Sequence, residues 1–199
     1  DIAFLPLEVL LVTMVLHKLL EQRSHRDMLH KLNMVIGAFF AETGTELLGH
    51  LSGFDDDVDD VRDELIPSAS WDDGQFVAAR TAIAAHHFKV DASRSDLVAL
   101  QEYLATQRPF LLRLLENQNL LEHQSFTNTL WAVFHLGDEL GHRRDLAVLP
   151  ASDVAHLSGD IKRAYAELAG QWLAHLQHLK SNYPYLFSLA VRTNPFDPK

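Results

Sequence analysis

A chain of 199 residues with 47% apolar and 22% charged residues is long enough to bury a core and too apolar to remain disordered. Its formal net charge of -10 argues against a nucleic-acid partner, because phosphate binding requires clustered Lys and Arg. The absence of Cys excludes disulfides, Cys-ligated zinc, iron–sulfur clusters and a thiol nucleophile.

The first segment is an apolar run, residues 2–20, interrupted by few polar residues. A bilayer-spanning helix needs about 20 predominantly apolar residues. The basic residues expected on the cytoplasmic side of a membrane lie at its end and beyond: Lys18, Arg23, Arg26 and Lys31. Residues 1–20 are interpreted as the end of a membrane anchor or, alternatively, as a buried first helix, and residues 21–199 as one helical-bundle domain. The start at Asp1 rather than Met predicts a fragment or a processed product.

Apolar residues next recur at spacings of three and four, the pattern of one helix face. The members of this stripe are Leu29, Leu32, Ile36, Phe40, Thr43, Leu47 and Leu51. No Pro interrupts residues 7–66, so the apolar run and the stripe can form one continuous helix. Gly53 predicts its end, because Gly readily adopts the C-cap conformation.

The remaining segments are also predicted to be helices. Ser70 is the expected cap of one of them, Ser95 with Asp96 is expected to open a second, and Pro109 suits the first turn of a third. The predicted ranges are 55–64, 71–88, 95–106, 110–116, 126–142 and 153–180, followed by a short apolar turn at 183–187. No segment alternates as a strand does. The fold class is therefore all-α, a multi-helix bundle with long first and last helices.

Three aspartates, Asp55, Asp57 and Asp59, match the opening spacing of a calcium-binding EF-hand loop. That loop also needs Gly at its sixth position and Glu at its twelfth, where this chain has Asp60 and Ile66. A solvated acidic helix start, favoured by the helix dipole, explains the aspartates better than calcium.

A second grouping suggests metal binding. Glu139 and His142 form an E-x-x-H pair, as in di-iron helical bundles, and His135 lies one turn earlier. No second E-x-x-H is present. At about 100° per residue, the apolar stripe of this helix leaves the three residues on its other side, facing solvent or a second interface. His135, Glu139 and His142 are therefore candidate ligands of iron or zinc outside the helix's own core.

His86 and His175, by contrast, lie on apolar stripes and are predicted to face inward. A buried imidazole needs hydrogen-bond partners, and Thr43 is the expected one. The pair is also a candidate cofactor site, for haem or a metal, or a pH-sensitive element. No nucleophile elbow, phosphate-binding loop or dinucleotide-binding motif is present, so no catalytic residue is predicted and catalysis is not expected.

Four strings carry a resemblance to a known family: residues 31–37, 120–126, 130–136 and 183–195. They resemble an uncharacterised bacterial family of helical proteins with a short N-terminal membrane segment. The resemblance implies a membrane tether and a helical domain on the cytoplasmic side, and it implies no activity.

The sequence thus predicts a membrane-associated helical interaction or signal-relay module at the cytoplasmic face of the cell membrane, or otherwise in the cytoplasm. Its expected partners are a protein or a second copy, with membrane contact through residues 2–20, no nucleic acid and no cofactor. One alternative is a metal- or haem-binding bundle acting as an oxidase or a sensor. Another is a soluble homodimerising scaffold, with the first helix and residues 183–187 between subunits.

Overall fold

The computed structural model describes residues 4–120 and 123–197. Within this part of the chain the regular elements are helices, and strand-like pairing is limited to one antiparallel bridge between Asp55 and Val90. The predicted all-α multi-helix bundle is therefore confirmed. The α-helices are α1 (Phe4–Phe39), α2 (Thr45–Ser52), α3 (Arg62–Leu65), α4 (Asp73–Ala85), α5 (Leu97–Leu115), α6 (Gln124–Gly141), α7 (Ala151–Asn182) and α8 (Pro184–Arg192). A π-helical turn, η1 (Phe40–Gly44), and two 3₁₀ turns, η2 (Val58–Asp60) and η3 (Gln118–Leu120), complete the set.

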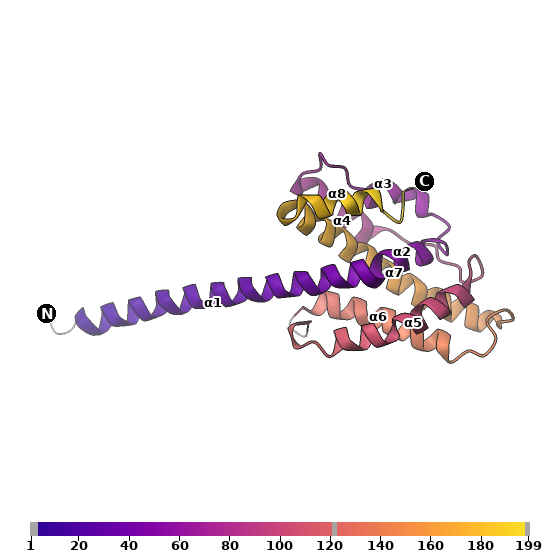
Figure 1. The fold of residues 1–199 in the computed structure, drawn as a ribbon, viewed down its shortest axis with the longest axis horizontal. Coiled ribbons are helices and arrows are strands. Elements are labelled where there is room, and N and C mark those ends of the chain that lie inside the picture. Colours follow the sequence, from indigo (N-terminus) through magenta and orange to yellow (C-terminus); the bar gives the residue numbers. More distant parts are fainter. Residues whose placement is uncertain (1–3, 121–122, 198–199) are drawn as a thin grey trace.

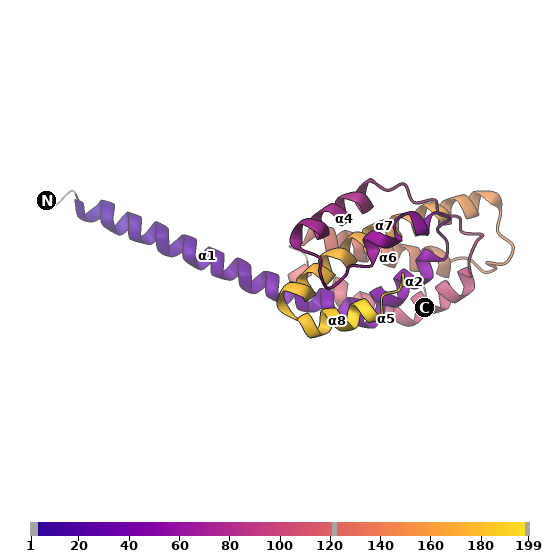
Figure 2. The same cartoon turned by 90° about the horizontal axis from the view of Figure 1, so that it is seen from above.

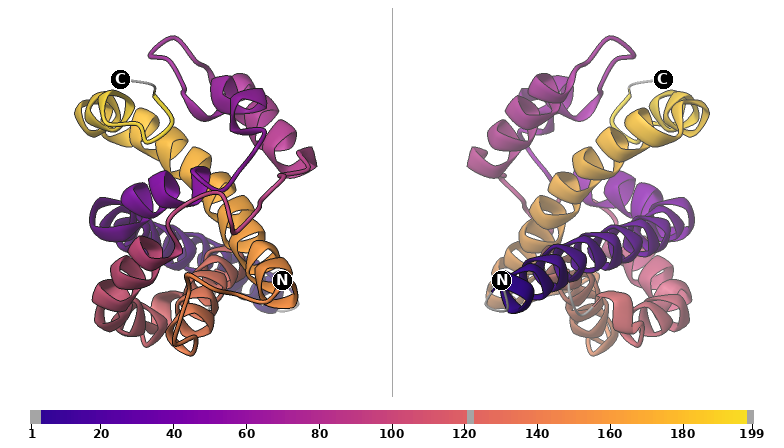
Figure 3. Two further views of the ribbon diagram at one scale, coloured as in Figure 1. Left: turned by 90° about the vertical axis from the view of Figure 1, so that its right-hand side faces the viewer. Right: turned by 90° about the vertical axis from the view of Figure 1, so that its left-hand side faces the viewer.

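The long helix α7 is the centre of the bundle. It contacts α1, η1, α2, α4, α6 and α8. Helices α5 and α6 lie on one side of it, and α3, α4 and α8 lie on the other (Figures 1 and 3). Because neighbours surround it, α7 buries more than one face, from Leu157 through Tyr165 to Leu179. His175, predicted to face inward on an apolar stripe, is buried together with Leu157, Leu168 and Leu179.

Only the second half of α1 belongs to the bundle. Leu32, Ile36 and Phe39 are buried, whereas every residue from Val9 to Ser24 is exposed. The first half projects away from all other elements (Figures 1 and 2), and residues 9–24 are called the arm below. Ile2 and Ala3, the first residues of the predicted anchor, lie outside the described residues. Among the described helices, none is long and apolar enough to cross a membrane.

The stripe predicted from Leu29 to Leu51 faces the core, but its helix is not regular. At η1 the backbone takes a wider turn, in which the Thr45 N–H and Oγ1 both donate to the Phe40 carbonyl. Consecutive residues Phe39 and Phe40 are both buried, and they pack on different helices: Phe39 against Phe126 of α6, Phe40 against Trp172 of α7. The π turn therefore ties α1 to both neighbours.

Two helix ends differ from the predictions. Gly53 follows α2 as expected, but its φ of -65° is ordinary right-handed backbone, so the predicted C-cap conformation is wrong. A Cβ at Gly53 would lie 2.9 Å from the Ser95 Oγ, so close approach explains this glycine. Helix α4 is capped by Asp72 rather than Ser70: its carboxylate accepts the Gln75 N–H, and the Gln75 side chain accepts the Asp72 N–H.

Pro109 lies inside α5 and does not separate two helices as predicted. Proline removes one helical hydrogen bond, here to the carbonyl of Ala105. Both residues are exposed, so water can reach the freed carbonyl. A solvent-facing proline is thus accommodated within one helix of 19 residues.

The acidic segment after α2 is structural. Asp55 is buried and accepts the backbone N–H groups of Lys89 and Asp57, so the prediction of a solvated helix start is wrong for this residue. Asp57 pairs with Lys89, and Asp59 pairs with Arg62. The three aspartates are therefore engaged in separate contacts: Asp55 and Asp57 join this segment to Lys89 after α4, and Asp59 makes a local pair with Arg62.

Candidate functional site

A cavity of about 540 Å³ lies between α1, α7 and α8, and η1 closes its inner side. Its size is within the range of small-molecule sites. Helix α8 forms one wall because Pro184 begins a new helix directly after α7 ends at Asn182, so the chain turns back beside α1 (Figure 3). The lining is mainly apolar, with three histidines among it: His30, His175 and His178.

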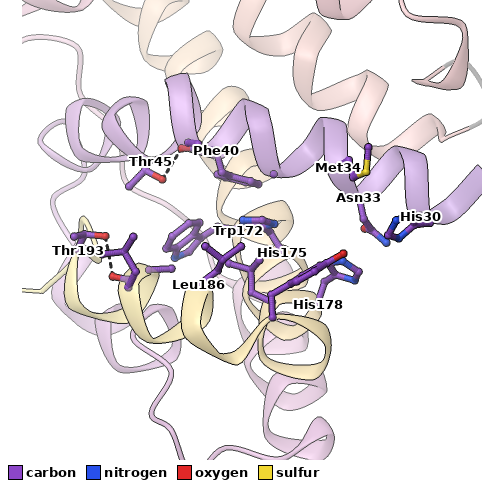
Figure 4. A pocket seen from close by; sticks show the side chains of 16 residues that line it. His30, Asn33, Met34, Phe40, Thr45, Trp172, His175, His178, Leu186 and Thr193 are labelled. Atoms are coloured by element: carbon purple, nitrogen blue, oxygen red, sulfur yellow. Dashed lines mark hydrogen bonds between the residues drawn. The ribbon is translucent and has the colours of Figure 1, made fainter.

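The inner wall is aromatic. The His175 imidazole stacks on Phe40, with ring centroids 4.9 Å apart and an interplanar angle of 13°, and the Trp172 indole lies beside both rings (Figure 4). Gly37 of α1 faces this wall, and a Cβ there would lie 3.7 Å from His175 Cε1. Glycine therefore leaves the imidazole open toward the cavity.

One buried polar group on this wall has no hydrogen-bond partner within the described residues. The Trp172 Nε1–H is buried and donates no hydrogen bond. His175 is buried, and its predicted partner Thr43 donates instead to the Gln107 Oε1, so that expectation is wrong. Burial, helped by nearby His178, lowers the pKa of His175 to about 4, so the imidazole is neutral near pH 7 and offers one donor and one acceptor.

The mouth of the cavity lies between α1 and α7, where His30 and His178 approach from the two helices (Figure 4). Partial burial, with a smaller contribution from His30, lowers the pKa of His178. Met34 and Leu186 are exposed apolar side chains in the same lining. The opening thus combines apolar side chains with two imidazoles.

Sequence reasoning identified His175 but missed His30 and His178. His178 follows His175 by three residues, which places both on one side of α7. That spacing could have pointed to it. His30 carries no comparable pattern, because its role depends on α8 and α7 lying opposite α1.

The predicted metal ligands divide between two places. His135 and Glu139 do lie together, with Nε2 and Oε1 3.9 Å apart. His142 is not with them: its Nδ1 donates to the Asp138 carbonyl at the end of α6. The neighbours of His135 and Glu139 are instead His156 and Asp160 of α7.

His86 and His175 are not a pair. His86 ends α4 and lines a separate, wider depression with His123 and Ser125, which shares no lining residue with the cavity of His175. The predicted haem or metal pairing of these two histidines therefore has no support in their positions. His123 caps α6 by accepting the Phe126 N–H.

Comparison with known proteins places this architecture in a family. Residues 28–192 match the family model described as "Uncharacterized protein MJ1433, C-terminal helical domain". The chain belongs to this family. It is also 48% identical over 198 residues to Uncharacterized protein MJ1433 of Methanocaldococcus jannaschii, which covers 100% of this chain and 79% of that protein. No solved structure matches the chain.

The MJ1433 match agrees with the predicted helical family, and neither comparison names an activity. The relative comes from an archaeon, so the comparison does not support the bacterial origin implied by the resemblance, and nothing in it supports a membrane segment. The MJ1433 helical domain begins at Met28, beside Leu29, the first residue of α1 that packs on the core. The arm thus precedes the matched domain, whereas the His135 group and all cavity-lining residues except Thr193 lie inside it.

Proposed function

We propose that this helical domain is a ligand-responsive interaction module. It binds a small, flat, mainly apolar molecule in the cavity and transmits occupancy through α1 to the arm. The observation that carries the proposal is that one helix, α1, is both a wall of the cavity and the base of the arm.

The lining supports this ligand class. A flat ring can extend the stack formed by Phe40 and His175. The neutral His175 gives no reason to favour an anion.

The route from cavity to arm is short. Of the lining residues, Asn33, Met34 and Gly37 fall on α1, about two and a half to three and a half turns from Ser24, the last residue of the arm. The next turn is η1, and single π turns inside α-helices are frequent at functional sites. If this turn has two conformations, a change between them would rotate α1 relative to α7. Coupling between two sites requires such an element with two arrangements.

The arm is the interaction surface of the module. Its large apolar side chains, Val9, Leu10, Leu11, Val12, Met14, Val15, Leu16, Leu19 and Leu20, are each more than 50% exposed. Contiguous apolar surface of this extent marks an interaction site. We propose the arm of a second copy as its occupant. Contact with the cytoplasmic face of a membrane is the alternative, favoured by the basic residues Lys18, Arg23 and Arg26.

Prodan, a neutral naphthalene ketone whose fluorescence reports polarity, is a suitable probe of the cavity. We expect one molecule to bind per chain and to slow hydrogen exchange of the amides from Asn33 to Thr45. Gly37→Leu fills the cavity in front of His175 and should weaken binding at least tenfold.

The matched control is Gly159→Leu, on an open face of α7 with no atom within 4 Å of the added Cβ. It should bind prodan like the unmodified protein. Equal prodan affinity in the two variants would refute the cavity as the site. Binding without any change in exchange along α1 would refute the relay.

A further inference from the structure

Two pairs of side chains meet where α6 packs on the first half of α7. His135 and Glu139 come from α6, and His156 and Asp160 come from α7, each pair separated by four residues and so on one face of its helix. This group, the α6–α7 cluster, is separate from the cavity and shares no residue with it.

The four side chains converge closely. His156 Nε2 lies 3.2 Å from Asp160 Oδ2 and 3.5 Å from Glu139 Oε2, and His135 Nε2 lies 3.7 Å from Asp160 Oδ1 and 3.9 Å from Glu139 Oε1. Ligand atoms at 2.0–2.1 Å from one tetrahedral ion are about 3.3 Å apart. One ligand atom from each of His135, Glu139 and His156 already lies within 4.8 Å of the other two, and Asp160 borders this group through Oδ2, 3.2 Å from His156 Nε2.

The buried carboxylate of Asp160 is the feature of the cluster that indicates a bound ligand. Its side chain is only 3% exposed, Oδ1 accepts a hydrogen bond from Arg163, and the buried Oδ2 accepts none. Buried carboxylates are normally paired, hydrogen-bonded or bound to a metal. Oδ2 lies 3.2 Å from His156 Nε2 without accepting a hydrogen bond from it. Both imidazoles face this carboxyl group, so a cation there would complete its coordination.

An arginine donates a hydrogen bond to one oxygen of each carboxylate, Glu139 and Asp160, and the other oxygen accepts none from it. Arg143 donates to Glu139 Oε2, which lowers the pKa of Glu139, and leaves Oε1 free beside His135. Arg163 leaves Asp160 Oδ2 free beside His156. Groups that orient metal ligands in this way are a regular part of metal sites.

We propose that the α6–α7 cluster binds one divalent ion of the zinc type through His135, Glu139, His156 and Asp160. Two imidazoles and two carboxylates suit zinc, whereas calcium and magnesium prefer oxygen ligands alone. The imidazoles are about half exposed, 45% for His135 and 54% for His156, so an ion can enter from solvent.

The test is titration of the full chain, freed of metal by chelation, with zinc chloride in a calorimeter. We expect one ion per chain. His135→Ala and His156→Ala should each weaken binding at least about 100-fold, because even a group that only orients a ligand contributes 10–100-fold. Arg163→Met, which removes such a group, should weaken it about 10–100-fold.

His142→Ala is the matched control, because His142 lies one turn beyond Glu139 but outside the cluster. It should bind zinc normally. A zinc-induced rise in melting temperature, present in this control and absent in His156→Ala, would distinguish lost binding from lost folding. No saturable binding, or equal loss in the control and the cluster variants, would overturn the metal site. The proposal for the cavity is independent of either result.

Discussion

Phe40 and His175 stack nearly parallel, with planes 13° apart, and so join the π turn after α1 to the central helix at the wall of the cavity. The contact holds an imidazole among apolar neighbours that favour its neutral form. It also places the π turn after α1 directly against a residue whose pKa is lowered by burial.

His175 should make the stability of the protein depend on pH. Its pKa falls from 6.5 in the unfolded chain to about 4 in the folded protein. Its contribution is therefore complete above pH 6.5 and is lost as the pH falls toward 4, because only the unfolded chain takes up the proton in that interval. The loss reaches about 3 kcal/mol.

Urea unfolding from pH 7.5 to 4.5 measures this effect. In His175→Phe the free energy of unfolding should depend less on pH than in the unmodified protein. Substitution of the exposed His87, in His87→Phe, should leave the pH dependence unchanged. Parallel profiles for His175→Phe and the unmodified protein would contradict the assignment.

Gly44 should be intolerant of a side chain. An added Cβ would lie 2.6 Å from the Phe40 ring and 2.7 Å from the Phe39 ring, both buried. Gly44→Ala should therefore lower the free energy of unfolding by about 1–3 kcal/mol, as overpacking does. Gly159→Ala, on an open helical face, should raise it by about 0.5–1 kcal/mol. Chemical denaturation measures the free energy of unfolding of both variants. A change of the same sign in the two would contradict the prediction.

The cap of α4 gives a comparison between neighbouring residues. Asp72→Ala removes the acceptor of the Gln75 N–H and should destabilise the protein by about 1 kcal/mol. Ser70→Ala, at an exposed position whose hydroxyl contacts only Ser68, should change stability by less than about 0.5 kcal/mol. If Ser70→Ala lost more stability than Asp72→Ala, Asp72 would not be the cap of α4.

The arm should control self-association. Light scattering of the full chain is expected to give the mass of an oligomer. Deletion of residues 1–20 should give a monomer with unchanged helical packing, because residues 9–20 are all exposed. A monomeric full chain that floats with anionic vesicles would favour the membrane alternative. A monomer that does not float would leave the arm without its proposed occupant.

Local sequence was sufficient for the helices and for most inward faces. The stripe from Leu29 to Leu51 is buried because side chains three and four residues apart share a helix face whatever the surroundings. Helix ends were less determined. Ser70 and Asp72 are both suitable caps, and Pro109 is compatible with a helix start or a solvent-facing interior position.

The candidate sites depended on tertiary structure. The apolar periodicity of α7 correctly predicted that His175 faces inward. The cavity next to His175, however, exists only because α8 folds back beside α1. Along α6, spacing correctly grouped His135 with Glu139, yet it could not show that the His142 imidazole turns to a backbone carbonyl where the helix ends. His156 and Asp160 join the cluster from another helix. Their distances to His135 and Glu139 are set by the crossing of α6 and α7, which the pattern within either helix does not specify.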